Sequence, residues 1–377
     1  MIKILPILIG AIIWAHYTQI TTIGKYGVEK RQVPLNRFLF FMLVFTLALP
    51  VMLRKSYNDT GAYINGFRQA DTLAVLLKSG ELHILKNPLF NIFEALVRTF
   101  TDNYMIFFMF PAFFVQYSYL RFIRKHSSNF VIGVGLYLLL GTYAFSIAAM
   151  KQTIAMAILL YAVELLIQRK YAGFYALVFL AFLFHTYAIA FVILPLFTVK
   201  PWTGRAFVLL FVVYFVMQNF NSVIESFLDF ANESGKNVSS SEIIGTTSIN
   251  PIRVAVYAVT PALAFVLRGY LFEDDKDREH NILVNMSIIT VAIMSLGLIS
   301  AANMFARMAQ YFEFGVICSL PWMLKKSFDK SSARFVGAIA IVCFVGYFCY
   351  ANLVQIYFDD HYGRHTILEF IRSLFVG

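Results

Sequence analysis

Three cationic or titratable side chains lie in otherwise apolar stretches of this sequence. Lys151 opens one apolar run, His185 interrupts the next, and Arg307 stands in the segment NMFARMAQYFEF. An arginine cannot shed its charge, and a histidine changes its charge near neutral pH. Fixed cations stabilise developing negative charge, and an imidazole can act as a general base or donate to a sugar or phosphate oxygen. These residues therefore indicate a site for an anionic substrate.

Each of the three also has a structural explanation. A lysine at a helix end commonly extends its charged group toward the membrane surface. A histidine in an apolar run commonly forms a hydrogen bond with a backbone carbonyl. Arg307 is followed by Glu313, which could form a structural ion pair with it. The spacing alone leaves both kinds of role open.

The composition places the chain in a membrane. Of its 377 residues, 59% are hydrophobic and only 14% are charged, whereas a soluble domain carries about 25% charged residues. Apolar windows of about 17–22 residues recur, as helices that cross a hydrocarbon core require, and the alternating segments of a β-barrel are absent. We predict an all-α polytopic membrane protein, one integral domain over 1–377, with about ten to twelve transmembrane helices. The expected helices are 2–20, 37–53, 103–122, 129–147, 152–168, 171–198, 205–220, 251–271, 281–300, 304–324 and 334–355.

Basic loops predict the orientation of these helices. Such loops are retained on the cytoplasmic side, which assigns the connections near 25–37, 121–125 and 169–170 to the inside. A single crossing by 171–198 would reverse the predicted sides of the loops that follow. This run has 28 residues, about 42 Å as a straight helix. A re-entrant pair of half-helices broken near His185 restores the alternation, and a tilted single span is the alternative.

Two long loops are expected outside, at 54–102 and 221–250. The second is polar and carries more acidic than basic residues. The first is basic, with Arg54, Arg68 and Lys86 among its cations, against the usual preference for positive charge inside. An outer loop that keeps this much positive charge suggests an anionic ligand.

The loop 54–102 also contains two helical patterns. Asp59 is a suitable N-cap for a short helix that carries Tyr63. Residues 89–100 show an apolar face at helical spacing, with Glu94 and Arg98 four residues apart and able to pair. This second helix is expected to lie along the membrane surface.

Four further polar residues are candidates for substrate contacts. Gln152 stands near the start of a helix, and Arg253 begins another on the predicted outer side. Gln310 and Tyr311 follow Arg307 by three and four residues, so each is expected to share a helix side with it.

Several function classes lack their motifs. The sequence contains no HExxH, no GxxxxGK and no glycine-rich nucleotide loop, and its three cysteines lie in apolar runs without a CxxC pair. The acidic connector 273–280 and the polar cluster 359–365 are expected to be solvated. Cytoplasmic loops account for the net charge of +10. We therefore expect no metal, no cofactor and no nucleic-acid partner.

Four short motifs follow one another along the chain: Arg54…Asp59-Thr60…Tyr63 followed by NPLFNIFEALV, Lys151-Gln152-Thr153-Ile154-Ala155, Phe184-His185-Thr186, and Arg307…Gln310-Tyr311-Phe312. In this order and spacing they resemble the EpsG family of bacterial exopolysaccharide polymerases, which are related to Wzy O-antigen polymerases. Family members usually have Arg-Gln-x-Ile-Ala where Lys151 begins its helix. The lysine keeps the charge but loses bidentate phosphate binding.

The resemblance implies a GT-C-like glycosyltransferase of the bacterial inner membrane. Such an enzyme moves a growing glycan between undecaprenyl-diphosphate-linked oligosaccharides at the outer leaflet, beside a flippase and a chain-length regulator. It would work among membrane lipids and without a metal. The implied catalytic residues are His185, Asp59 and Arg307, with Asp59 or His185 as the base. The implied substrate-binding residues are Lys151, Gln152, Arg54, Tyr63, Arg68, Arg253, Gln310 and Tyr311.

Two other classes of protein fit part of the pattern. A flippase or transporter of lipid-linked saccharides also needs many helices and interior cations, but it commonly shows two similar halves, and this sequence has no internal repeat. A membrane O-acyltransferase acting on glycans needs a catalytic histidine, for which His16 or His185 is available. That alternative leaves the basic outer loop unexplained.

Overall fold

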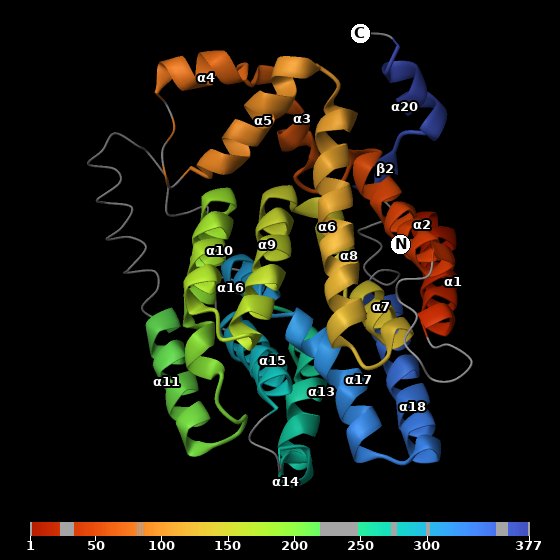
Figure 1. The fold of residues 1–377 in the computed structure, drawn as a ribbon, viewed down its shortest axis with the longest axis vertical. Coiled ribbons are helices and arrows are strands. Elements are labelled where there is room, and N and C mark those ends of the chain that lie inside the picture. The colour runs from red at the N-terminus through yellow and green to blue at the C-terminus, as the bar shows by residue number, and fades with distance from the viewer. Residues whose placement is uncertain are drawn as a thin grey trace. The chain divides into compact units, whose positions relative to one another are not determined.

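The computed structural model describes residues 2–22, 34–80, 82, 84, 86–218, 248–272, 277–298, 302–351 and 361–375. The chain divides into two compact units, Met1–Ile189 with Gly337–Gly377 (unit 1) and Ala190–Val336 (unit 2). Nearly all described elements are helices (Figure 1), because a segment in lipid must satisfy its backbone hydrogen bonds internally. The predicted all-α polytopic membrane fold is confirmed. Most of the predicted outer loop 221–250 lies outside the described residues.

Unit 1 contains long helices, several of which can be followed in Figure 1, short helices that come between α2 and α6 in the sequence, and the strands β1 and β2. Helix α18 begins in unit 2 and ends in this unit. The elements of unit 1 are η1 Ile2–Ile4, α1 Leu5–Thr22, α2 Pro34–Met52, β1 Arg54–Ser56, α3 Thr60–Gln69, α4 Leu73–Ser79, α5 Pro88–Phe100, α6 Tyr104–His126, α7 Phe130–Leu139, α8 Thr142–Ala148, α9 Met150–Ile167, α10 Tyr171–Phe184, α18 Lys330–Cys349, β2 Gly363–Arg364 and α20 Ile367–Ser373.

Unit 2 is built around α15, which packs against α11, α13, α16 and α17. Helix η2 begins at the end of unit 1 and continues into this unit, where the Asn285 side chain donates hydrogen bonds of 2.7 Å to the carbonyls of Phe197 and Val199. The elements of unit 2 are η2 Thr186–Phe197, α11 Gly204–Gln218, α13 Pro251–Val266, α14 Arg268–Leu271, α15 Arg278–Leu296, α16 Ala302–Gln310 and α17 Phe314–Ser327.

Five of the described helices are long and apolar enough to cross a membrane, which confirms a multi-pass membrane protein. A sixth span is obtained if α7 and α8 are counted together, and α1, α10, η2 and α13 are shorter apolar helices. The expected number of ten to twelve exceeds the count of full-length spans among the described residues. The difference arises because several expected helices are broken into shorter ones. The five spans are Leu35–Met52, Tyr104–His126, Met150–Ile167, Arg278–Leu296 and Ser331–Cys349.

The breaks fall at particular residues. The prediction of one helix over 129–147 is wrong, because α7 and α8 bend by 55° around Gly141, whose φ of 90° suits a glycine. The helix expected over 304–324 is divided by a turn at 311–313. The break predicted near His185 is confirmed, since α10 ends there and His185 has extended backbone. The re-entrant path of this segment stays a prediction.

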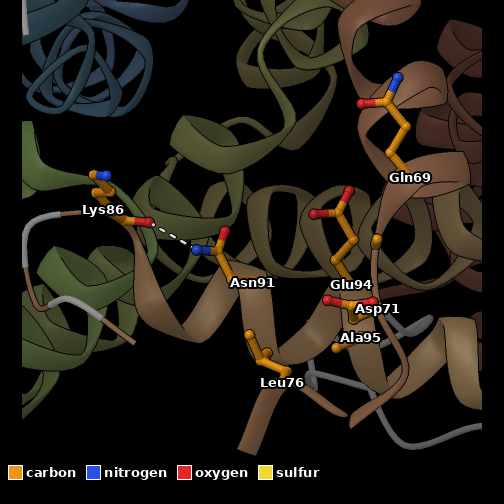
Figure 2. A pocket seen from close by; sticks show the side chains of 8 residues that line it. Gln69, Asp71, Leu76, Lys86, Asn91, Glu94 and Ala95 are labelled. Atoms are coloured by element: carbon orange, nitrogen blue, oxygen red, sulfur yellow. Dashed lines mark hydrogen bonds between the residues drawn. The ribbon is translucent and has the colours of Figure 1, made fainter. Parts of the chain in front are cut away.

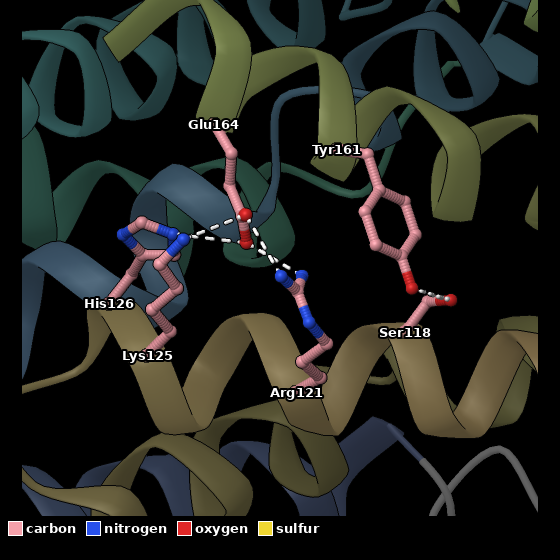
Figure 3. Close-up of polar contacts among 6 residues, drawn as sticks. All are labelled: Ser118, Arg121, Lys125, His126, Tyr161 and Glu164. Carbon is pink, nitrogen blue, oxygen red and sulfur yellow. Dashed lines mark hydrogen bonds and ion pairs between the residues drawn. The ribbon is translucent and has the colours of Figure 1, made fainter. Parts of the chain in front are cut away.

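One buried carboxylate joins α6 and α9 within unit 1 (Figure 3). Glu164 accepts two hydrogen bonds from Arg121, at 2.7 and 3.0 Å, and one of 2.8 Å from Lys125. The ring of His126 lies 3.5 Å from the same carboxylate. The basic residues expected in a cytoplasmic loop thus lie in the last turns of α6, where they neutralise a charge that would be costly alone.

The chain returns near its C-terminus to the segment that follows α2. Strand β2 pairs antiparallel with β1, with Arg54 opposite Arg364. The hydroxyl of Tyr362 donates to the carbonyl of Pro50 at 3.0 Å, and the ammonium of Lys3 donates to the carbonyl of Tyr362 at 3.1 Å. The prediction that the cluster 359–365 is only solvated is wrong for its described part, 361–365, because this segment pairs with β1, while Asp359 and Asp360 lie outside the described residues.

Candidate functional site

Arg54 is a buried cation with an incomplete set of partners. Only 1% of the residue is exposed. Its Nη1 donates to the carbonyl of Val51 at 3.1 Å, its Nη2 lies 3.8 Å from the sulfur of Met150, and its Cζ lies 4.1 Å from the ring centre of Phe108. Its Nε has no hydrogen-bond partner, and it forms no ion pair with a carboxylate among the described residues.

The charge of Arg54 persists in this environment. Burial lowers its pKa to about 10, and the nearby Tyr63, Tyr362 and Asp59 act in the opposite direction. The guanidinium therefore stays protonated at neutral pH. Because a buried charge that is not paired with a carboxylate is destabilising, the arrangement suits an anion that would supply the missing hydrogen-bond acceptors.

Lys151 provides a second cation at the same end of α9. Its backbone amide donates to the hydroxyl of Tyr63 at 3.3 Å, and its ammonium lies 4.6 Å from the ring centre of Phe90. The preceding residue, Met150, is the sulfur contact of Arg54. Tyr63 therefore contacts both Arg54 and Lys151, because the Arg54 Cζ lies 6.0 Å from the centre of its ring.

Helix α3 begins beside these cations. Asp59 occupies its N-cap position, as predicted, although its side chain makes no capping hydrogen bond. The two residues before it, Tyr57 and Asn58, have φ values of 152° and 42°. Such backbone costs of order 1–3 kcal/mol per residue and is often found at functional sites. The carboxylate of Asp59 interacts electrostatically with Arg54, and Tyr63 follows one turn later.

Glu94 on α5 lies beside α3 and interacts electrostatically with Lys151. It follows Phe90 by four residues, so the two share a face of α5. A Cβ built on Gly66 would lie 3.4 Å from its Oε1, which places the carboxylate against α3. Burial raises the pKa of Glu94, and the ammonium of Lys151 partly offsets this effect.

A pocket of about 480 Å³ lies next to Glu94. Its wall comes from the end of α3, from α4 and from α5. Figure 2 shows Asn91 and Glu94 directed to the same side of α5, and the Asn91 side chain donates to the carbonyl of Lys86 at 3.1 Å. The volume is within the range of about 300–1,000 Å³ that small-molecule sites occupy. The lining residues include Gln69, Asp71, Leu76, Lys86, Asn91 and Glu94.

His185 lies at the end of α10, close to the beginning of α5. Its backbone amide donates to Ala181, its ring centre lies 5.4 Å from that of Tyr187, and it is half-buried. The hydroxyl of the next residue, Thr186, donates to the side chain of Asn87 at 3.5 Å. Since α10 packs along α9 and against α5, His185 lies at the same end of unit 1 as Lys151.

Two other predicted residues of unit 1 are Arg68 in α3 and Gln152 in α9. Arg68 is exposed, with its Cζ 5.8 Å from the ring centre of Tyr104. Gln152 is only 1% exposed and lies inside the helix packing.

The remaining predicted residues belong to unit 2. The Cζ of Arg253 lies 5.8 Å from the ring centre of Tyr257, and the Nε of Arg307 donates to the side chain of Asn303 at 3.1 Å. Helix α16 ends at Gln310, so Tyr311 is the first residue after it.

Tyr311 and Gln310 are both buried, with 1% and 6% exposed. The Tyr311 ring is therefore not exposed for a sugar to stack on it, and the Gln310 side chain is likewise covered. The hydroxyl of Tyr257 donates a hydrogen bond to the carboxylate of Glu313, and the pair of Glu313 with Arg307 stays a prediction.

Sequence reasoning assigned Glu94 to the wrong partner. The expected pair with Arg98 is not formed, because Arg98 pairs instead with Asp102. The position of Glu94 could have been inferred from its spacing of four residues from Phe90. Only the structure, however, shows that Phe90 contacts Lys151.

The structure thus defines a multi-pass helical membrane protein in which Arg54 of β1, Tyr63 of α3 and Lys151 of α9 form a cluster. The chain belongs to the EpsG family, whose sequence model matches residues 37–361. No curated protein and no solved structure gives a match. The resemblance predicted from the four motifs is therefore confirmed at the level of the family.

Proposed function

We propose that this protein is a glycosyltransferase that polymerises polyprenyl-diphosphate-linked oligosaccharide repeat units into a long surface polysaccharide. It would act at the outer leaflet of the bacterial inner membrane. The observation that carries the proposal is the buried Arg54, which has no carboxylate partner among the described residues and which contacts Tyr63, as the backbone of Lys151 also does. Membership of the EpsG family fits a role in polysaccharide synthesis.

The chemistry of this reaction suits the site. When the glycan leaves its lipid carrier, the diphosphate oxygen gains negative charge. Arg54 and Lys151 would stabilise that charge, because preorganised cations act strongly where water is excluded. The hydroxyl and ring of Tyr63, which contacts the start of α9, would position the first sugar. The acceptor hydroxyl needs a base, for which the sequence indicates Asp59 or His185.

Two arginines of unit 2 have a role of their own in this proposal. Arg253 and Arg307 are proposed as further cations for the lipid-linked glycan. A flippase would supply the repeat units, and a chain-length regulator would act beside the polymerase. Substitution of Arg307 or His185 by alanine is expected to leave protein levels intact and to yield single-repeat products in cells.

The test uses purified full-length protein and repeat units extracted from membranes of cells that lack it. Wild type should convert them into a ladder of longer glycans. Arg54→Met should abolish the ladder while the unfolding temperature stays equal or rises, because an apolar residue of similar size removes a buried charge that has no paired carboxylate. Arg205→Gln, at an exposed residue of unit 2, is the control and should polymerise normally.

Two results would contradict the proposal. One is wild-type protein that makes no longer glycan from these units, and the other is Arg54→Met protein that makes the full ladder. The flippase alternative makes a different prediction, which is that cells lacking the protein keep their lipid-linked repeat units on the inner leaflet. Accumulation of single units on the outer leaflet supports the polymerase.

A further inference from the structure

The pocket of about 480 Å³ and the Lys151 cation are both close to one carboxylate, that of Glu94. Glu94 lines the pocket, and it also interacts electrostatically with Lys151. The connection is α5, since Phe90 contacts the Lys151 ammonium and Glu94 follows one turn later on the same face. Glu94 therefore lines the pocket and also interacts with the Lys151 cation.

The other side chains of the pocket suit an uncharged polar molecule. Gln69 and Asn91 supply amide donors and acceptors, Asp71 and Lys86 supply one charge of each sign, and Leu76 supplies an apolar surface. Sugars are bound by such mixtures of amide and charged groups around an apolar patch, because each hydroxyl both donates and accepts. The pocket therefore favours a glycan over a phosphate group.

We propose that this pocket holds the acceptor sugar and that Glu94 removes the proton from its attacking hydroxyl. The inference rests on the proposed polymerase function and assigns its acceptor subsite and its base. Glu94 would be a catalytic residue, in contact with the reacting hydroxyl.

The step balances as a direct displacement. The acceptor oxygen forms a bond to the anomeric carbon of the donor glycan, and the bond from that carbon to the diphosphate oxygen breaks. The diphosphate leaves with the electron pair of that bond, next to Arg54 and Lys151. The acceptor proton passes to the carboxylate of Glu94. No oxidant, reductant or further co-reactant is needed.

Geometry favours Glu94 over the two bases that the sequence indicated. Neither Asp59 nor His185 is among the residues that line this pocket. Asp59 also interacts with Arg54, so it serves better to tune the cations than to meet the acceptor. Burial raises the pKa of Glu94, which makes its ionised form a stronger base.

The experiment compares wild type with Glu94→Gln and Glu94→Asp as purified full-length proteins. Binding of undecaprenyl diphosphate is measured separately from transfer between extracted repeat units. Glu94→Gln should bind undecaprenyl diphosphate like wild type but transfer about 10²–10⁴-fold more slowly. Glu94→Asp should recover part of the rate, because it restores a carboxylate.

Glu369→Gln is the matched control. This residue closes a capping box at the start of α20 and is exposed, and glutamine serves the same capping role. Its transfer rate should equal that of wild type.

The outcomes separate the two proposals. Wild-type protein without transfer refutes the polymerase function itself. Active wild type with an equally active Glu94→Gln variant refutes only the role of Glu94. The role of Glu94 as the base would also be refuted if Glu94→Gln lost undecaprenyl diphosphate binding by the same factor as it lost transfer rate. Glu94 would then be a residue of the donor site.

Discussion

The ammonium of Lys151 lies 4.6 Å from the centre of the Phe90 ring, while the backbone amide of the same lysine donates to the hydroxyl of Tyr63. One residue thus joins the start of α9 to both α5 and α3. A cation over an aromatic face gains about 0.5–2 kcal/mol, so the contact also fixes where the charge lies. This contact is the geometric basis for the proposal that Lys151 binds the diphosphate.

The first prediction concerns the charge of Lys151. Lys151→Ala should yield only single-repeat glycans, with a loss of about 10–100-fold in transfer, since a hydrogen bond to a charged group contributes about 1.5–3 kcal/mol. Lys151→Arg should keep polymerisation, because it retains the charge and adds a bidentate donor. Glycan length on gels of cell extracts measures the result. Long chains made by Lys151→Ala would remove this residue from the mechanism.

The second prediction concerns Tyr362 and the strand pair that holds Arg54 in place. Tyr362→Phe removes the hydrogen bond to the carbonyl of Pro50 and leaves that buried acceptor unpaired. The loss should be about 1–3 kcal/mol of unfolding free energy, measured by thermal unfolding in detergent. Tyr17→Phe is the control, because Tyr17 is 52% exposed. Equal stability of the two variants would contradict the structural role of the C-terminal segment.

The third prediction tests the carboxylate that joins α6 and α9. Glu164→Gln keeps the shape but removes the charge that Arg121 contacts through two hydrogen bonds. We expect a loss of about 1.5–3 kcal/mol, the range for charge-assisted bonds, and a lower unfolding temperature. Asp329→Asn, at an exposed carboxylate, should have no such effect. A Glu164→Gln protein as stable as wild type would show that these bonds add nothing net.

The fourth prediction compares two helical glycines. A Cβ added at Gly315 would lie 2.5 Å from the carbonyl oxygen of Leu283 and from the Cβ of Met286, so Gly315→Ala must push α17 away from α15. Overpacking of this kind costs about 1–3 kcal/mol. Nothing lies within 4 Å of the same position at Gly346, so Gly346→Ala should be neutral or stabilising. The unfolding temperatures of the two variants test this prediction. A Gly315→Ala protein with the unfolding temperature of wild type would argue against close packing of α17 on α15.

The sequence by itself determined the features that depend on local pattern. Apolar windows and the scarcity of charge specify membrane helices, and helical spacing in 54–102 specifies α3 and α5. The interruption at His185 was also predictable, because a polar residue in an apolar run marks a place where a helix can end. Arg54, Lys151 and Tyr63 were named from their types and positions, and the structure brings these three together.

The tertiary structure alone decided the features that join distant parts of the chain. The pairing of β1 with β2, the burial of Arg54 and the meeting of Glu94 with Lys151 join residues far apart in the sequence. The bend at Gly141 likewise depends on how α7 and α8 pack. A periodic pattern states which face of a helix is apolar, but it does not state which other helix covers that face. The partners of a buried charge are therefore fixed only when the helices pack.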